Sequence, residues 1–137
     1  MRKMALDYGD VRIGIAFSDL LNIIANGYET YTRKGLQEDI EYLANLVKEK
    51  EVDTIILGLP INMDGTEGER AKVTREFGDL LAQRTKLPIK YLDERLTSAS
   101  AERMLIEADM RREKRKQVID KISATIILQN YLDMFSK

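Results

Sequence analysis

The stretch Met4-Ala5-Leu6-Asp7-Tyr8-Gly9-Asp10-Val11-Arg12-Ile13-Gly14-Ile15-Ala16-Phe17-Ser18-Asp19 decides the fold of this chain. An apolar run too short for a typical helix reaches Asp7, and apolar residues return at alternate positions from Val11 to Phe17. This pattern predicts two strands joined by a hairpin, with Gly9-Asp10 as its two-residue loop. Asp7 then ends a buried strand, where an ionised carboxylate needs hydrogen bonds, a counter-charge or a metal. The residue by itself fits equally well an aspartate that caps its own hairpin.

The composition predicts one globular domain over residues 1–137, with 44% hydrophobic and 33% charged residues. No apolar run approaches the roughly 18 residues of a membrane span, and residues 4–6 are too short for a signal-peptide core. We therefore expect a cytoplasmic protein with no membrane partner.

The chain contains neither cysteine nor histidine. This composition excludes disulfides, thiolate chemistry, histidine-ligated zinc and a Ser-His-Asp triad. Any hydrolysis must use carboxylates, lysine, tyrosine or a metal-activated water. The net charge of -1 provides no global attraction for nucleic acid, so a nucleic-acid partner would need a local basic patch.

The remaining pattern alternates helices and strands. We expect a strand at 23–32 interrupted at Asn26-Gly27, a helix at 36–50, a buried strand at 54–58 and a strand at 89–92. The predicted buried residues of the first helix are Ile40, Leu43, Ala44 and Val47. We also expect a helix capped by Thr97 or Ser98 that carries Met104, Leu105 and Ala108, then a charged stretch at 111–117 and a last helix that ends at Phe135.

Between the two later strands, Asp64 and Glu67 have the spacing of a capping box. We expect them to open a helix that ends near Arg84. Its predicted buried residues are Val73, Phe77, Leu80 and Leu81.

This order predicts an α/β fold built on a mixed sheet, with three antiparallel strands followed by parallel strands and with helices on its faces. Sites in such sheets form beyond the carboxyl ends of parallel strands. Asp7, the loop 60–66 and the pair Asp93-Glu94 all follow strand ends, so we expect them at one edge of the sheet.

The acids allow more than one interpretation. On a helical wheel Asp120 lies between Ile127 and Tyr131, an apolar sector, although a carboxylate favoured by the helix N-terminus or paired with Lys121 or an arginine would also explain it. Strand alternation places Asp93 and Glu94 on opposite sides without deciding which one faces a site. A capping Asp93 with a solvated Glu94 is the alternative.

Three carboxylates from two strand ends and a helix would suit Mg²⁺ or Mn²⁺, which prefer oxygen ligands. Two such ions about 3.5–4 Å apart stabilise the attacking and leaving oxygens of a phosphodiester. This chemistry needs no histidine.

Two segments are candidates for binding nucleic acid. The loop 58–66 presents the Asn62 amide and the Thr66 hydroxyl before a helix, although an ordinary connecting loop has the same features. Residues 111–116 carry five basic side chains and one acid, among them Lys114, Arg115 and Lys116, and would hold a phosphate backbone unless they are merely solvated. Arg12, Lys90 and Arg95 could extend this surface.

Four motifs together resemble the YqgF/RuvX family, in order along nearly the whole chain. They are 6–9 with 12–14, 58–60 with 62–66, 93–97, and 119–121. The resemblance implies a ribonuclease H-like fold and a metal site of Asp7, an acid of the 93–94 pair and Asp120. Of the pair we favour Glu94. Asp10 and Ser123 depart from the family pattern, which usually has threonine and often alanine there, and neither departure removes a ligand.

The resemblance implies a hydrolase, a two-metal nuclease in ribosome biogenesis that processes the 5′ end of precursor 16S rRNA. The alternative substrate is a four-way DNA junction, since the family is also described as Holliday junction resolvases. A resolvase needs two active sites, most simply those of a dimer, whereas an RNA-trimming enzyme can act as a monomer. We therefore expect a monomer or weak homodimer. A nucleic-acid-binding module without catalysis, or a nucleotide-binding domain similar to the sugar kinase and actin superfamily, would be functions of another class.

Overall fold

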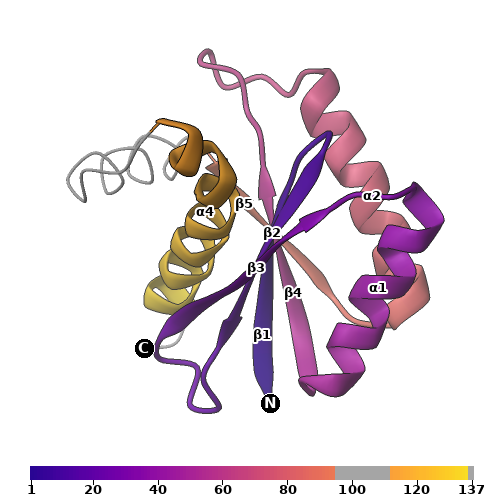
Figure 1. Ribbon diagram of the computed structural model, residues 1–137, viewed down its shortest axis with the longest axis vertical. Helices are drawn as coiled ribbons and strands as arrows, with labels where there is room; N and C mark the ends of the chain where they lie inside the picture. Colours follow the sequence, from indigo (N-terminus) through magenta and orange to yellow (C-terminus); the bar gives the residue numbers. More distant parts are fainter. Residues whose placement is uncertain (95–111, 136–137) are drawn as a thin grey trace.

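The computed structural model describes residues 1–94 and 112–135, and the side chains of residues 1–94 and 121–134. The described strands form one five-stranded sheet of order β3-β2-β1-β4-β5 (Figure 1). They are β1 (Arg2–Tyr8), β2 (Arg12–Ser18), β3 (Ala25–Thr32), β4 (Val52–Leu59) and β5 (Ile89–Asp93). β1, β2 and β3 pair antiparallel, whereas β4 and β5 run parallel to β1. The predicted mixed sheet is confirmed.

Helices cover both faces of this sheet. Figure 1 shows α1 (Leu36–Glu49) and α2 (Glu69–Thr85) on one side and α4 (Arg112–Phe135) on the other. The predicted helix at 36–50 is confirmed, because α1 buries all four residues expected of it and also Asp39 and Leu46. None of the helices in the described part of the chain is long and apolar enough to cross a membrane.

Alternation along β1 builds a core on each face. Met4, Leu6 and Tyr8 join the cluster under α1 and α2, whereas Ala5 joins a cluster with Ile127 and other residues of α4. Because side chains alternate along a strand, Asp7 follows Ala5 to the α4 face. The sheet therefore places this acid at the carboxyl end of β1, beside the long C-terminal helix.

The hairpin turn is larger than predicted. Pairing of β1 with β2 ends at Tyr8 and Ile13, and the Gly9 N–H bonds the Arg12 carbonyl at 2.9 Å. Val11, expected in the buried alternation, lies in this turn and is 60% exposed. A Cβ at Gly9 would lie 2.8 Å from the Arg12 oxygen, so the closure of this turn requires glycine.

The predicted capping box is wrong. α2 begins at Glu69, after Gly68, and no side chain caps it. Asp64 instead accepts hydrogen bonds from the Thr66 backbone N–H at 3.0 Å and from the Thr66 hydroxyl at 2.6 Å, which fold the preceding loop on itself.

The buried stripe of α2 differs from the predicted one. Val73 and Leu80, predicted to be buried, are 39% and 40% exposed, whereas Phe77 and Leu81 are buried as expected. Ala71, Thr74 and Gly78 complete the stripe that faces the sheet.

β3 begins at Ala25 and passes through the predicted interruption at Asn26-Gly27. Its register with β2 shifts between Ile15 and Ala16, so the interruption is a local irregularity within a continuous strand. A Cβ at Gly27 would lie 2.9 Å from the Thr125 hydroxyl oxygen of α4. Glycine at this position therefore lets the helix approach the sheet closely.

Candidate active site

Asp7 and Glu94 meet at the carboxyl ends of their strands. Asp7 is the second-last residue of β1, and Glu94 directly follows β5. The two half-buried side chains are hydrogen-bonded to each other. The structure thus brings together two of the predicted site residues from segments that lie far apart in the sequence.

Gly58 separates these two acids and leaves room for them. It lies on β4, between β1 and β5, and a Cβ there would be 2.8 Å from both Cγ and Oε1 of Glu94. The same Cβ would be 2.6 Å from Cδ1 of Ile127 in α4. A residue with a side chain at position 58 would therefore displace the Glu94 carboxyl from Asp7.

The carboxyl pair is electrostatically unfavourable when both members are ionised. Burial, followed by the hydrogen bond and the charge of Glu94, raises the pKa of Asp7 to about 9, and the Arg70 charge offsets this only in part. Asp7 therefore keeps its proton near neutral pH. A divalent cation would replace that proton and satisfy both groups.

The two remaining acids are placed differently. Asp93 follows Tyr91 in the alternation of β5, on the side away from Leu92 and Glu94. The backbone of Asp120 lies in α4, four residues before Ala124 and seven before Ile127, both of which are buried against the sheet. The Asp120 side chain is outside the described residues, so its role as a ligand stays a prediction.

The donor set fits a hard divalent cation. Asp7 and Glu94 offer carboxylate oxygens on one side of the sheet, the ligand type that Mg²⁺ and Mn²⁺ prefer. Among the side chains of residues 1–94 and 121–134, no third acid completes a cluster of metal ligands. The helix that carries Asp120 passes this face, and Asp120 would supply the third carboxylate.

The structure describes only some of the predicted nucleic-acid-binding residues. Arg12 begins β2 beside the turn. The Asn62 amide donates to the Thr66 hydroxyl at 3.1 Å, so both side chains brace their own loop. Lys114, Arg115 and Lys116 lie in the first turns of α4 with side chains outside the described residues, and Arg95 and the predicted helix at 97–108 lie outside them entirely.

Sequence reasoning missed two arginines that hold the turn after Asp7. The Arg70 Nη2 donates to the Tyr8 carbonyl at 3.2 Å, and Arg70 also forms an ion pair with Asp10. The Arg33 Nη1 donates to the Gly9 carbonyl at 3.1 Å. No local pattern marks either arginine, because each lies more than twenty residues from the backbone that it contacts.

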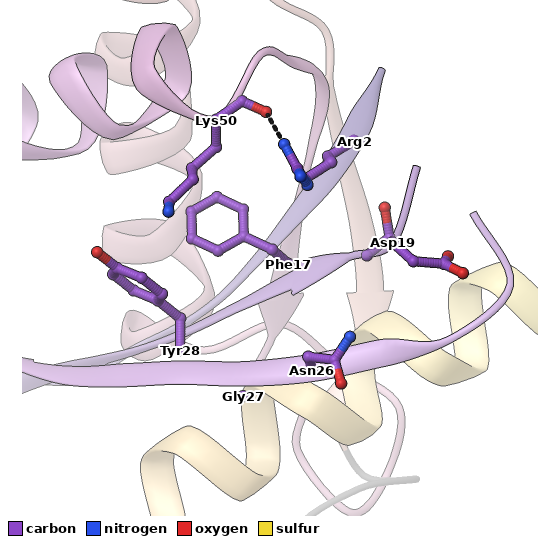
Figure 2. A pocket seen from close by; sticks show the side chains of 8 residues that line it. Arg2, Phe17, Asp19, Asn26, Gly27, Tyr28 and Lys50 are labelled. Carbon is purple, nitrogen blue, oxygen red and sulfur yellow. Dashed lines mark hydrogen bonds between the residues drawn. The ribbon is translucent and has the colours of Figure 1, made fainter. Parts of the chain in front are cut away.

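A separate pocket of about 260 Å³ lies at the opposite end of the sheet, where β1 begins. Figure 2 shows Arg2, Phe17, Tyr28 and Lys50 around it, near the amino end of β1. Because β1 runs from Arg2 to Tyr8, this pocket is remote from the carboxyl pair and is not part of the candidate active site.

Comparison with known proteins places the chain in a family. The family profile described as "RuvX: Holliday junction resolvase" matches residues 1–134. A relative from Syntrophomonas wolfei is 53% identical over 133 residues, which cover 97% of this chain and 94% of the relative. One from Halothermothrix orenii is 53% identical over 137 residues, 100% and 98% of the two chains. Both carry the name "Putative pre-16S rRNA nuclease".

Solved structures share the fold. RuvC of Thermus thermophilus in complex with a Holliday junction substrate superposes with a TM-score of 0.62 at 10% identity, covering 98% of this chain and 96% of RuvC. The Fowlpox virus resolvase with junction DNA gives 0.62 at 11% identity and covers both chains fully. At these identities the likeness concerns the fold alone, and it confirms the predicted ribonuclease H-like arrangement. The match over residues 1–134 and the relatives at 53% identity show that the chain belongs to the RuvX family.

Proposed function

We propose that this protein is a metal-dependent nuclease that hydrolyses phosphodiester bonds at the 5′ end of precursor 16S rRNA. The observation that carries the proposal is the hydrogen-bonded pair of Asp7 and Glu94 at one end of the sheet. The names of the relatives at 53% identity supply the substrate. Because such processing acts on precursor ribosomes, we further propose that the protein works in the cytoplasm.

The residues of the chain have distinct tasks in this proposal. Asp7, Glu94 and Asp120 would hold Mg²⁺ or Mn²⁺, with Asp93 as the less favoured ligand. When bound, these ions act as Lewis acids on the phosphodiester and its attacking water. Gly58 keeps the Glu94 carboxyl beside Asp7, and Arg70 and Arg33 hold the backbone that follows Asp7.

Basic and polar groups would hold the substrate around this site. We propose that Arg12, Asn62, Thr66 and Arg95 bind the nucleic acid. Lys114, Arg115 and Lys116 would bind phosphates of the same nucleic-acid strand farther from the cleaved bond. These contacts are independent of base identity, so substrate choice would depend on the shape of the nucleic acid.

A four-way DNA junction is the second candidate substrate, favoured by the description of the family. A junction needs two symmetric cuts and hence two copies of the site, whereas 5′ trimming of RNA needs one. We therefore propose a monomer or a weak homodimer that acts on RNA.

Parallel digestion tests the proposal. A precursor 16S rRNA fragment and a four-way DNA junction are incubated with the protein in Mg²⁺ or Mn²⁺, with Asp7→Asn and Glu94→Gln as variants. We expect metal-dependent cleavage of the RNA that both variants abolish. Preferential cutting of the junction would establish the second candidate. Binding of either substrate without any cleavage would contradict a nuclease and identify a binding module.

A further inference from the structure

Arg70 lies at the edge of the candidate active site and contacts the backbone next to Asp7. It belongs to the first turn of α2, and its Nη2 donates to the carbonyl of Tyr8 at 3.2 Å. Its Nη1 forms an ion pair with Asp10 in the turn between β1 and β2. The charge of Arg70 also acts on the Asp7 carboxyl. The Arg70 guanidinium thus has two partners, the backbone carbonyl of Tyr8 at the site and the carboxylate of Asp10 outside it.

The ionic partner is weakly held. The Asp10 side chain is 83% exposed and that of Arg70 is 47% exposed. Exposed ion pairs contribute little, because water and salt screen both charges. Arg33, the other arginine on this turn, pairs instead with an Asp39 carboxylate that is completely buried. Of these two arginines, only Arg70 can exchange its carboxylate for another anion at small cost.

A phosphate is the anion most suited to replace the Asp10 carboxylate on the Arg70 guanidinium. The planar guanidinium donates two parallel hydrogen bonds to a carboxylate or a phosphate with the same geometry. Its anchor on the Tyr8 carbonyl keeps the group next to the acidic pair, where a phosphodiester must lie to be cut. Any negative charge on the carboxyl pair repels that phosphodiester, and a cation at this position would offset the repulsion.

We infer that Arg70 binds a backbone phosphate of the nucleic acid in the active site, and that Asp10 competes with the substrate for this guanidinium. The inference rests on the proposed function and adds a substrate-binding residue and an internal competitor to it. It predicts that removing Asp10 strengthens substrate binding, and that this gain depends on Arg70.

A double-mutant cycle tests this coupling. Fluorescence anisotropy gives the affinity of each variant for a labelled RNA that spans the 5′ end of 16S rRNA, in EDTA so that no cleavage occurs. Asp10→Asn should tighten binding by at most about fivefold, the range of an exposed ion pair. Arg70→Gln should weaken binding and lower the salt slope by about one. In the Arg70→Gln background, Asp10→Asn should have no further effect.

The Glu41–Arg84 pair is the matched control. It also joins an exposed arginine of α2 to an exposed carboxylate, at 2.6 Å, but at the far end of the helix. Glu41→Gln and Arg84→Gln should leave RNA affinity nearly unchanged. Thermal unfolding of every variant checks that the fold is intact. If Arg70→Gln unfolds, the affinity of Asp10→Asn still tests the inference, because this substitution replaces an exposed turn residue.

The possible failures are distinguishable. Equal tightening by Asp10→Asn with and without Arg70 would show a general charge effect and overturn the inference. Unchanged affinity in both single variants would overturn it as well. In either case metal-dependent cleavage by the parent protein would leave the proposed function intact. A parent protein that neither binds nor cuts the RNA would overturn both.

Discussion

At the scale of single residues, Asp7 is the group whose surroundings most oppose its charge among the side chains that the structure describes. Its pKa is raised from 3.8 to about 9, first by burial and then by Glu94. Between these values the folded state binds a proton that the unfolded state has released. The linkage relation then requires that the free energy of unfolding falls as pH rises from about 4 to about 9 without metal.

Asp7→Asn should remove this pH dependence, because an amide keeps a hydrogen bond to Glu94 and carries no charge. At about pH 8 in EDTA we expect the variant to be more stable by about 1–3 kcal/mol. Urea unfolding at about pH 5 and about pH 8 provides the measurement. Asp10→Asn, at a side chain that is 83% exposed, serves as the control. A parent protein whose free energy of unfolding does not change over this pH interval would argue against the raised pKa of Asp7.

Metal binding should depend on pH for the same reason. A cation held by Asp7 and Glu94 displaces their proton, so below about pH 9 each bound ion releases one proton. We expect the Mn²⁺ affinity to rise about tenfold per pH unit from about pH 6 to about pH 8. Calorimetry in buffers of different ionisation enthalpy counts the released protons. An affinity independent of pH would mean that this pair does not bind the ion.

At the scale of secondary-structure elements, β4 separates the two strands that carry the acids. Gly58→Ala would place a Cβ 2.8 Å from Cγ and Oε1 of Glu94 and 2.6 Å from Cδ1 of Ile127. We expect cleavage to fall by about tenfold or more through displacement of the carboxyl, with a loss of stability of about 1–3 kcal/mol from overpacking. Cleavage kinetics and urea unfolding measure the two effects.

Gly35→Ala is the matched control, since its Cβ would lie 3.4 Å from a flexible Glu38 oxygen. It should leave cleavage unchanged. Full activity of Gly58→Ala would show that the position of Glu94 does not depend on this glycine.

Polar contacts of Arg33 connect the first turn of α1 to the turn between β1 and β2. Arg33 pairs with Asp39 at 2.9 Å and also donates to the Gly9 carbonyl at 3.1 Å. Burial alone would raise the pKa of Asp39, but hydrogen bonds from Arg33, the Lys34 backbone and Tyr31 outweigh it and lower the pKa below 3.8. The stability that this group contributes is therefore present above pH 3.8 and is lost as pH falls through the lowered value.

Arg33→Gln should destabilise the protein by about 3–5 kcal/mol, because it leaves the Asp39 charge buried without its partner. Arg84→Gln, which breaks an exposed pair with Glu41, should cost at most about 1 kcal/mol. Urea unfolding at neutral pH measures both. Equal losses of stability in the two variants would contradict a role of burial. Partial recovery of stability in Arg33→Gln/Asp39→Asn would support the explanation that the unpaired, buried Asp39 charge causes the loss.

At the scale of the whole molecule, a chain with a net charge of -1 must bind nucleic acid through a local concentration of basic groups. Replacing Lys114, Arg115 and Lys116 by alanine should weaken RNA binding and reduce its salt slope by up to about 2.7, if each contacts one phosphate. Anisotropy titrations over a range of salt concentrations give the slope. An unchanged slope would remove these residues from the binding surface.

The control for this variant removes three lysines from the opposite edge of the sheet. Lys48, Lys50 and Lys86 lie at the carboxyl ends of α1 and α2, away from the acidic pair. Their replacement by alanine gives the same change in net charge. It should leave the salt slope unchanged if binding is confined to the active-site edge.

The sequence by itself determined the order of the elements and the position of the acids along them. Large apolar residues at alternate positions from 13 to 17 specify a strand, and the helical spacing from Ile40 to Val47 specifies α1. These patterns are local, since each follows from the geometry of one element. Acids at the carboxyl ends of parallel strands lie at the same end of the sheet, which was enough to predict that Asp7 and the 93–94 pair lie close together.

Only the tertiary structure decided which atoms meet at that edge. Strand alternation left Asp93 and Glu94 open, and the choice of Glu94 depends on Gly58 and α4, which lie far from it in the sequence. The larger turn and the contacts of Arg70 likewise depend on segments that no local pattern connects. The raised pKa of Asp7 is of this kind too, because burial and the approach of a second charge exist only once the chain has folded.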